Sequence, residues 1–243
     1  MGTGSTAPRY LDIIAAIFIT ALIVSNLVAS KTASLFGVTV GVGVFVFPVS
    51  YIVGDVLTEV YGYSAPRRVI WIGFGAAAFA ALVFLAADLV PPSPSYRHQA
   101  AFHAILGQSP YVLVASLAAY WAGEFCNSYV LAKLKVLSRG RWLWTRTIGS
   151  TVVGQAVDSL IFYPCAFFLL PILFRFPEGV WSGGQLVAVM VGNYVIKVGV
   201  EAVCTPVTYK VVALLKRTEG IDVYDRHTNF NPFVLSDQRG SGG

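Results

Sequence analysis

The sequence predicts an all-α integral membrane protein with six transmembrane helices. Three observations lead to this fold class. The chain of 243 residues is 56% hydrophobic and only 12% charged, a profile typical of membrane proteins rather than soluble domains. Six apolar runs each approach the ~20 residues that a helix needs to cross the hydrocarbon core. Successive loops alternate between many and few basic residues, as expected when they lie on opposite sides of a membrane.

The predicted spans cover residues 10–28, 42–61, 69–90, 111–131, 148–170 and 186–209. They form one transmembrane domain, residues 1–217, followed by a polar cytoplasmic tail, residues 218–243. The first run lacks the Ala-x-Ala cleavage site of a signal peptide, so we expect a retained span. The last apolar run continues to Leu215, which predicts a long sixth helix. Pro48 predicts a kink near the start of the second span.

The loop charges predict that both termini are cytoplasmic. The segments assigned to the outside contain only Lys31, Arg97 and Arg175. The inside segments are much richer in positive charge, as the positive-inside rule requires. Their basic residues are Arg9, Arg67, Arg68, Lys133, Lys135, Arg139, Arg141, Arg146, Lys210, Lys216 and Arg217.

Other segments carry weaker signals. The outer loop 91–110 contains apolar residues at helical spacing, which predicts a short helix that either lies on the membrane surface or acts as a lid. The run GFGAAAFAA at residues 73–81 predicts close helix packing. On three spans an acidic residue is followed by a Tyr and then by basic residues. This recurrence leaves open the interpretation that the chain consists of three helical-hairpin repeats. The tail end SDQRGSGG is typical of disorder.

Polar side chains interrupt three of the predicted spans. Each set follows one helical face, with spacings of three or four residues. Lipid offers no hydrogen-bonding partners, so these faces must meet one another or a wet cavity. The residues are Glu124 and Asn127 in the fourth span, Gln155 and Asp158 in the fifth, and Asn193, Lys197 and Glu201 in the sixth.

Acidic residues outnumber basic ones within the spans. Lys197 is the only basic residue well inside one, against five acids including Asp55 and Glu59 of the second span. A structural ion pair for Lys197 leaves the other acids without a counter-charge. At least one carboxyl group must therefore be protonated, solvated or waiting for a ligand with N–H groups. Carboxylates with neighbouring amides suit the edge of a flat heterocycle, which aromatic side chains can stack against.

Several function classes are disfavoured. No Walker A motif is present, so the chain does not hydrolyse ATP itself. Asp55 and Asp158 could imitate an intramembrane aspartyl protease, a remote alternative because their predicted depths differ. The three histidines fall in loops or the tail, and the cysteines lack metal-ligand spacing, so we expect no metal, no cofactor and no enzymatic activity. The positive charge is explained by topology and does not indicate nucleic-acid binding.

Five blocks of sequence resemble the queuosine-precursor transporter family, also called the vitamin uptake transporter or YhhQ family. They cover nearly the whole chain in order. The blocks are NLVASK at 26–31, FPVSYIVGDVLTEVYGYSAPRRVIW at 47–71, ASLAAYWAGEFCNSYVLAKLK at 115–135, RTIGSTVVGQAVDSLIF at 146–162 and DVYDRHTNFNPF at 222–233.

The resemblance implies a bacterial inner-membrane importer of 7-deazaguanine bases such as 7-cyano-7-deazaguanine. A stand-alone secondary transporter or facilitator is the leading hypothesis, and a binding subunit of an ATP-driven complex is the alternative. The preferred base, proton coupling and homo-oligomer formation stay open. We expect the polar faces to bind the nucleobase-like substrate. We expect Asp55, Glu59, Arg67, Arg68 and Lys133 to form a cytoplasmic gate or structural ion pairs.

Overall fold

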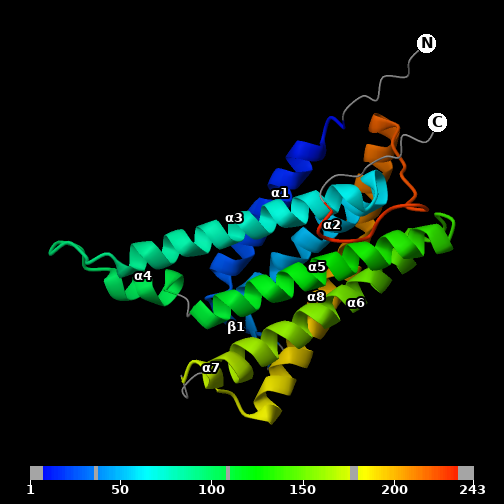
Figure 1. The fold of residues 1–243 in the computed structure, drawn as a ribbon. Coiled ribbons are helices and arrows are strands. Elements are labelled where there is room, and N and C mark those ends of the chain that lie inside the picture. The colour runs from blue at the N-terminus through cyan, green and yellow to red at the C-terminus, as the bar shows by residue number, and fades with distance from the viewer. Residues whose placement is uncertain (1–7, 36–37, 108–109, 176–179, 235–243) are drawn as a thin grey trace.

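The computed structural model describes residues 8–35, 38–107, 110–175 and 180–234 as a bundle of long helices (Figure 1). The predicted all-α membrane fold is therefore confirmed, with one small hairpin added. The hairpin pairs β1 (Thr32–Leu35) with β2 (Val38–Gly41) in antiparallel register. The bundle consists of α1 (Leu11–Val28), α2 (Phe47–Tyr61), α3 (Ser64–Leu89), α5 (Pro110–Leu137), α6 (Leu143–Pro164) and α8 (Gly183–Glu219).

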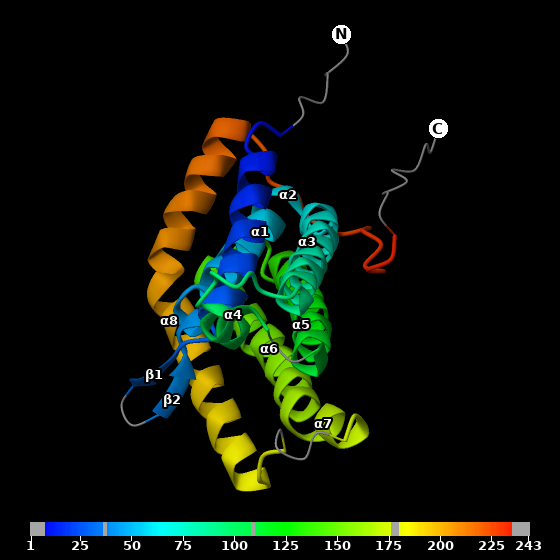
Figure 2. The same ribbon diagram turned by 90° about the vertical axis from the view of Figure 1, so that its left-hand side faces the viewer.

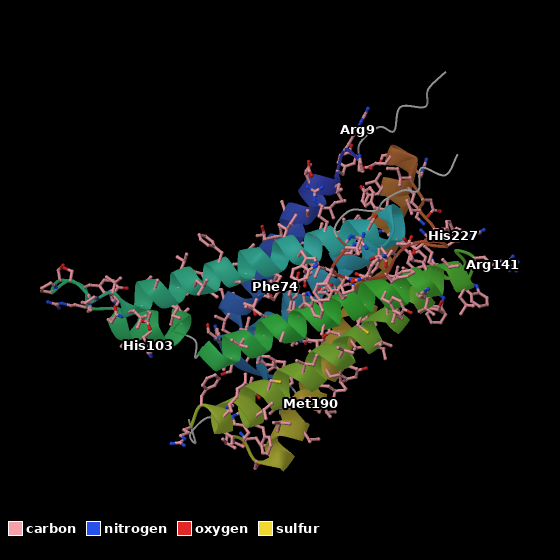
Figure 3. All side chains as sticks on the ribbon, viewed as in Figure 1. Arg9, Phe74, His103, Arg141, Met190 and His227 are labelled. Atoms are coloured by element: carbon pink, nitrogen blue, oxygen red, sulfur yellow. The ribbon has the colours of Figure 1, made fainter. Side chains whose placement is uncertain are left out.

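The two ends of the bundle differ in composition. The hairpin, the short helix α4 (Gln99–Leu106) and α7 (Leu170–Leu173) lie at one end, here called the hairpin end (Figures 1 and 2). The start of α1, the end of α8 and the residues after it lie at the other, here called the tail end. Figure 3 shows Arg9, Arg141 and His227 at the tail end and His103 at the hairpin end. Basic loop residues thus gather at the tail end.

Within the described residues, five helical segments are long and apolar enough to cross a membrane: Leu11–Val28, Val42–Tyr61, Ser64–Leu89, Leu143–Leu173 and Gly183–Glu219. Helix α5 is not among them, because polar residues interrupt it, although its 28 residues suffice in length. The multi-pass membrane fold is thereby supported, whereas six spans and their orientation remain predictions. Helix α8 has 37 residues and is long, as predicted.

Large apolar side chains cover the outside of the bundle. Phe79 is 68% exposed, Leu82 61% and Val203 79%. An apolar surface of this kind suits contact with lipid tails and would be unstable in water. The buried apolar core lies between α1, α2, α3 and α5, where Phe18, Leu57 and Ile70 pack together.

The second predicted span differs from the structure in detail. It begins with a separate 3₁₀ turn, η1 (Val42–Phe45), and the α-helix starts only at Phe47. Pro48 therefore lies in the first turn of α2, where its missing N–H has no intrahelical role. The predicted kink at Pro48 is wrong for this reason.

The predicted helix of the outer loop is confirmed as α4. Its His103 Nδ1 lies 2.6 Å from Asp88 Oδ2 at the end of α3, which fixes α4 against the bundle. None of its side chains is buried.

The helical segment that continues α6 contains two prolines. A π-helical turn, η2 (Cys165–Leu169), follows Pro164, and α7 contains Pro171. Pro171 has no N–H to donate to the carbonyl four residues earlier. That carbonyl, of Phe167, instead accepts from the backbone N–H of Trp181 at 2.9 Å. This hydrogen bond connects the segment after α6 to the residues just before α8.

Residues 220–234 of the predicted polar tail run in extended form along the tail end of the bundle. The N–H of Val223 donates to the carbonyl of Val60 at 3.2 Å. Trp71 Nε1 donates to the carbonyl of Pro232 at 2.8 Å. This part of the tail is docked. The last residues of the chain, SDQRGSGG, which were predicted to be disordered, lie outside the described residues.

Candidate binding site

A cavity of about 760 Å³ opens between the hairpin and the helices at the hairpin end. Its volume lies within the usual range of small-molecule sites, ~300–1,000 Å³. The wall is contributed by α1, the hairpin, α2, α5, α6 and α8, elements that are far apart in the sequence. Three residues of the predicted polar faces line it, namely Asp158, Asn193 and Lys197.

The charged part of the wall is an ion pair between α6 and α8. Lys197 Nζ lies 2.9 Å from Asp158 Oδ2, with the two side chains 14% and 7% exposed. The same ammonium group lies 4.2 Å from the ring centre of Phe47. A donor and a carboxylate acceptor therefore stand side by side on the wall of a largely apolar cavity.

Aromatic rings form the neighbouring wall. Phe167 and Trp181 stack with ring centres 3.9 Å apart and an angle of 14° between the planes. Phe162 packs edge-on against Phe167, and Tyr163 lies beside both. Tyr120 lines another part of the cavity. Such rings offer flat faces against which a planar ligand can stack.

The other predicted polar residues lie behind this wall, in a packed group here called the acidic cluster. It consists of Asp55, Glu124, Asn127, Gln155 and Glu201, each at most 3% exposed. Asn127 Nδ2 donates to Asp55 Oδ1 at 2.8 Å. Thr151 Oγ1 donates to Glu201 Oε1, and the carboxyl groups of Asp55 and Glu201 contact each other. Helices α2, α5, α6 and α8 thus meet through polar groups.

Glycines make this close approach possible. A Cβ added to Gly54 would lie 3.2 Å from Glu124 Oε2, so α2 and α5 touch where that carboxyl group sits. A Cβ on Gly154 would lie 2.7 Å from the Cβ of Asn127 and 3.0 Å from the carbonyl of Gly123. Only glycine allows the backbones of α5 and α6 to come this near.

An ionic hub closes the tail end. Glu59 Oε1 accepts from Arg146 Nη2 and from Lys216 Nζ, both at 2.8 Å. Lys135 Nζ lies 3.8 Å from the same oxygen and 2.6 Å from Asp222. Burial raises the pKa of Asp222, but hydrogen bonds from Lys135 and Lys216 outweigh it and lower the pKa below its usual value. The hub therefore links α2, α5, α6, α8 and the tail.

Two of the remaining gate candidates, Arg67 and Lys133, contact the tail. Arg67 is 1% exposed, and its Nη1 donates to the carbonyl of Asn229 at 2.8 Å. Lys133 lies 4.2 Å above the ring of Phe230. Arg68 is exposed. Asp55 belongs to the acidic cluster and not to the hub.

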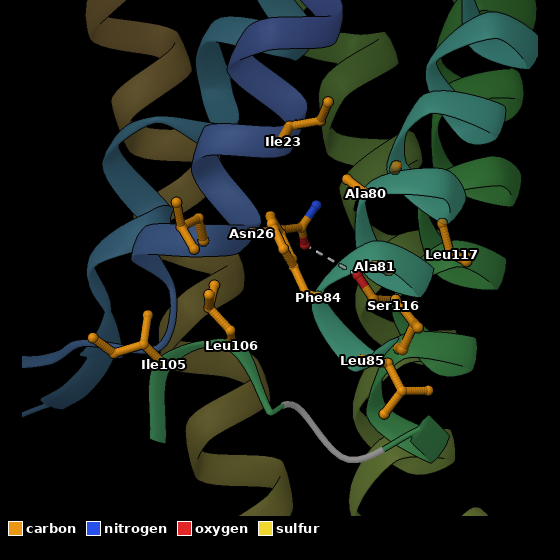
Figure 4. A pocket seen from close by; sticks show the side chains of 13 residues that line it. Ile23, Asn26, Ala80, Ala81, Phe84, Leu85, Ile105, Leu106, Ser116 and Leu117 are labelled. Atoms are coloured by element: carbon orange, nitrogen blue, oxygen red, sulfur yellow. Dashed lines mark hydrogen bonds between the residues drawn. The ribbon is translucent and has the colours of Figure 1, made fainter. Parts of the chain in front are cut away.

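A smaller pocket of about 60 Å³ lies between α1, α3, α4 and α5 (Figure 4). Ser116 Oγ donates to Asn26 Oδ1 at 3.2 Å at its side. The lining is otherwise apolar, and the volume is too small for a heterocycle. The larger cavity is the better candidate site.

Comparison with known proteins decides the family. The family model described as "Putative vitamin uptake transporter" matches residues 41–211. The chain belongs to this family. It is 30% identical to the "Probable queuosine precursor transporter" of Bacillus subtilis (strain 168), over 82% of this chain and 83% of that one. It is 24% identical to the "Queuosine precursor transporter" of Escherichia coli (strain K12), over 60% of this chain and 64% of that one. No solved structure matches the chain.

Membership in a transporter family agrees with the expectation that the chain is not an enzyme. The proposed aspartyl protease pair also has no geometric basis here. Asp55 is bonded to Asn127, whereas Asp158 is paired with Lys197. The two aspartates therefore serve different groups and do not form a dyad.

Sequence reasoning missed several residues that this transporter brings to the site. Tyr51 is fully buried, and its hydroxyl lies beside Gly123, with no hydrogen-bond partner among the described residues. Lys216 and Asp222 join the hub. The one available signal for the tail was its density of Asp, Asn and aromatic residues, which is unusual for a disordered end.

Proposed function

We propose that this protein imports queuosine precursors, 7-deazaguanine bases, across the bacterial inner membrane as a stand-alone secondary transporter or facilitator. The named relatives support the substrate class. In this proposal the chain has six spans and both termini in the cytoplasm, so that the cavity faces outward and the ionic hub faces inward. The basic residues at the tail end favour this orientation.

The Asp158–Lys197 pair is the observation that carries the proposal. A guanine-type edge presents a carbonyl acceptor, a ring N–H and an exocyclic amine in a row. Asp158 can accept from the two N–H groups, while Lys197 or Asn193 donates to the carbonyl. The donor and acceptor of the pair already stand 2.9 Å apart on one wall.

The aromatic residues supply the second part of recognition. The residues Phe162, Tyr163, Phe167 and Trp181 line the same cavity as Asp158. A purine-like ring held at its edge by Asp158 can stack on these side chains, and stacking contributes about 1–3 kcal/mol per base. The cavity volume of about 760 Å³ leaves room for the base and several waters.

Binding to purified protein tests the proposal. We expect labelled 7-cyano-7-deazaguanine to bind in preference to guanine, and Asp158→Asn to weaken this binding at least tenfold. Asp88→Asn is the matched control, because Asp88 pairs with His103 and does not line the cavity. Uptake into liposomes that contain only this protein would show that no ATP-driven partner is needed. Absence of binding by the whole deazaguanine panel would contradict the proposal.

A further inference from the structure

The acidic cluster lies apart from the cavity that is proposed to bind the base. Its three carboxyl groups, of Asp55, Glu124 and Glu201, come from α2, α5 and α8 and are 1%, 0% and 3% exposed. None of the three lines the 760 Å³ cavity. Three acids buried close together are costly unless something compensates them.

Much of the hydrogen-bonding capacity of the cluster is unused. Both oxygens of Glu124 lack a partner in the described part of the chain, as do Gln155 Oε1 and Nε2. Glu201 Oε2 and the Tyr51 hydroxyl are also unpartnered there. No lysine or arginine in residues 8–35, 38–107, 110–175 and 180–234 forms an ion pair with any of the three acids. Unpaired polar atoms buried this deeply indicate a ligand.

The ligand must be very small. Gly54 and Gly154 bring the helices into contact around Glu124, so a heterocycle has no room there. The acids also do not form a metal-binding group among the described residues. A proton needs no cavity, and it removes the charge that makes a buried carboxylate unstable.

The cluster adjoins the cavity at Gly123, the residue before Glu124. A Cβ on Gly123 would lie 2.8 Å from the Tyr51 hydroxyl and 3.0 Å from the Cβ of Asp158. Asp158 therefore has one side toward the cavity and one toward the cluster. Asp55 lies one helical turn before Glu59 on α2, so carboxyl groups extend from the cavity toward the ionic hub.

We propose that Glu124, with Asp55 and Glu201, is the proton-binding site that couples transport to the proton gradient. This inference rests on the proposed function, because the base that drives the coupling binds at Asp158. The titratable groups facing Glu124 are Tyr51 and Asp55 on α2, Tyr120 on α5, Asp158 on α6 and Glu201 on α8. All are acidic, so a proton at Glu124 relieves repulsion from each ionised one.

The coupling has a definite sign. A neutral base that inserts between Asp158 and Lys197 replaces a cationic partner of Asp158 with uncharged N–H donors. The negative potential of Asp158 at Glu124 then increases, and protonation of Glu124 becomes more favourable. Base and proton bind cooperatively, and linkage requires that each raise the affinity for the other by the same factor. The proton therefore moves in the same direction as the base.

Calorimetry tests this directly. The heat of binding 7-cyano-7-deazaguanine to purified protein is measured in buffers of different ionisation enthalpy, which gives the number of protons taken up. We expect proton uptake by the wild-type protein, and affinity that falls by up to about tenfold per unit as pH rises. Glu124→Gln should bind without proton uptake, with an affinity that no longer varies with pH. Asp88→Asn should behave as the wild type.

The outcomes separate the two proposals. Wild-type protein that binds the base without taking up protons overturns the coupling site and leaves the proposed function intact. Protein that binds no deazaguanine base overturns both. Glu124→Gln that still takes up protons, or that loses the base altogether, also rejects the site. If size-exclusion chromatography shows that Glu124→Gln is misfolded, Glu201→Gln takes its place under the same expectations.

Discussion

Lys197 is the residue on which two interpretations of the cavity converge. It is an ion-pair partner of Asp158 and, in the proposed function, a donor to the base. Both roles follow from one position, because its ammonium group lies 2.9 Å from Asp158 and 4.2 Å from the centre of the Phe47 ring. A purely structural pair would stabilise the bundle and contribute nothing to base binding. A pair that belongs to the binding site would stabilise the bundle and also bind the base.

Lys197→Gln separates these roles. The variant leaves the Asp158 carboxylate without its cation, so we expect a loss of about 1–3 kcal/mol in the free energy of unfolding. Adding Asp158→Asn removes the uncompensated charge and should restore most of that loss. Base affinity should fall at least tenfold in the single and the double variant. Thermal unfolding in detergent and base binding measure the two effects. A stable double variant with normal affinity would make the pair purely structural.

At the scale of elements, α5 and α6 approach each other closely along a seam of small residues. Gly123 and Gly154 face each other there, and Asn127 packs against Gly154. The sequence drew attention instead to residues 73–81 of α3. In that run Gly73 is close to the Tyr120 hydroxyl, but Gly75 has nothing within 4 Å of a Cβ position. The small-residue run therefore marks a close contact at Gly73 but gives no sign of the seam between α5 and α6.

Gly154→Ala tests the seam. Its Cβ would meet the Cβ of Asn127 at 2.7 Å, and neither helix can retreat without displacing the acidic cluster. We expect a loss of about 1–3 kcal/mol in stability, typical of overpacking. Gly199→Ala on α8 is the matched control, because nothing lies within 4 Å of its added methyl group. The melting temperatures of the two variants measure the difference in stability. Equal melting temperatures would show that the α5–α6 seam accommodates the added methyl group.

The sequence predicted the helices well because apolar length is a local property. It grouped the polar residues of three spans on single helical faces, yet it could not divide them between the cavity wall and the acidic cluster. Asp158 and Gln155 are three residues apart, and only the packing of α5 against α6 decides that one reaches the cavity. The hairpin at residues 32–41 and the docked tail were missed because both depend on distant partners, such as Trp71 for Pro232.

At the scale of the whole molecule, one end is open and the other is closed. The hairpin end contains the large cavity, whereas the tail end is held by the hub and the docked tail. In a transporter with this cavity on the outer side, the hub must open for the base to leave inward. The stability of the ion pairs in the hub then determines how often the inner side opens. This stability depends on Glu59, because basic residues of three helices contact its carboxylate.

Glu59→Gln should weaken the closed end strongly. Arg146 is 2% exposed and would lose the carboxylate that compensates its buried charge. Breaking a buried pair by removing one partner typically costs about 3–5 kcal/mol, so we expect a large fall in melting temperature. Asp222→Asn is the comparison, because that side chain is 41% exposed and its loss leaves Glu59 beside Lys135, so we expect a smaller fall. Equal melting temperatures for the two variants would show that the docked tail, and not Glu59, keeps this end closed.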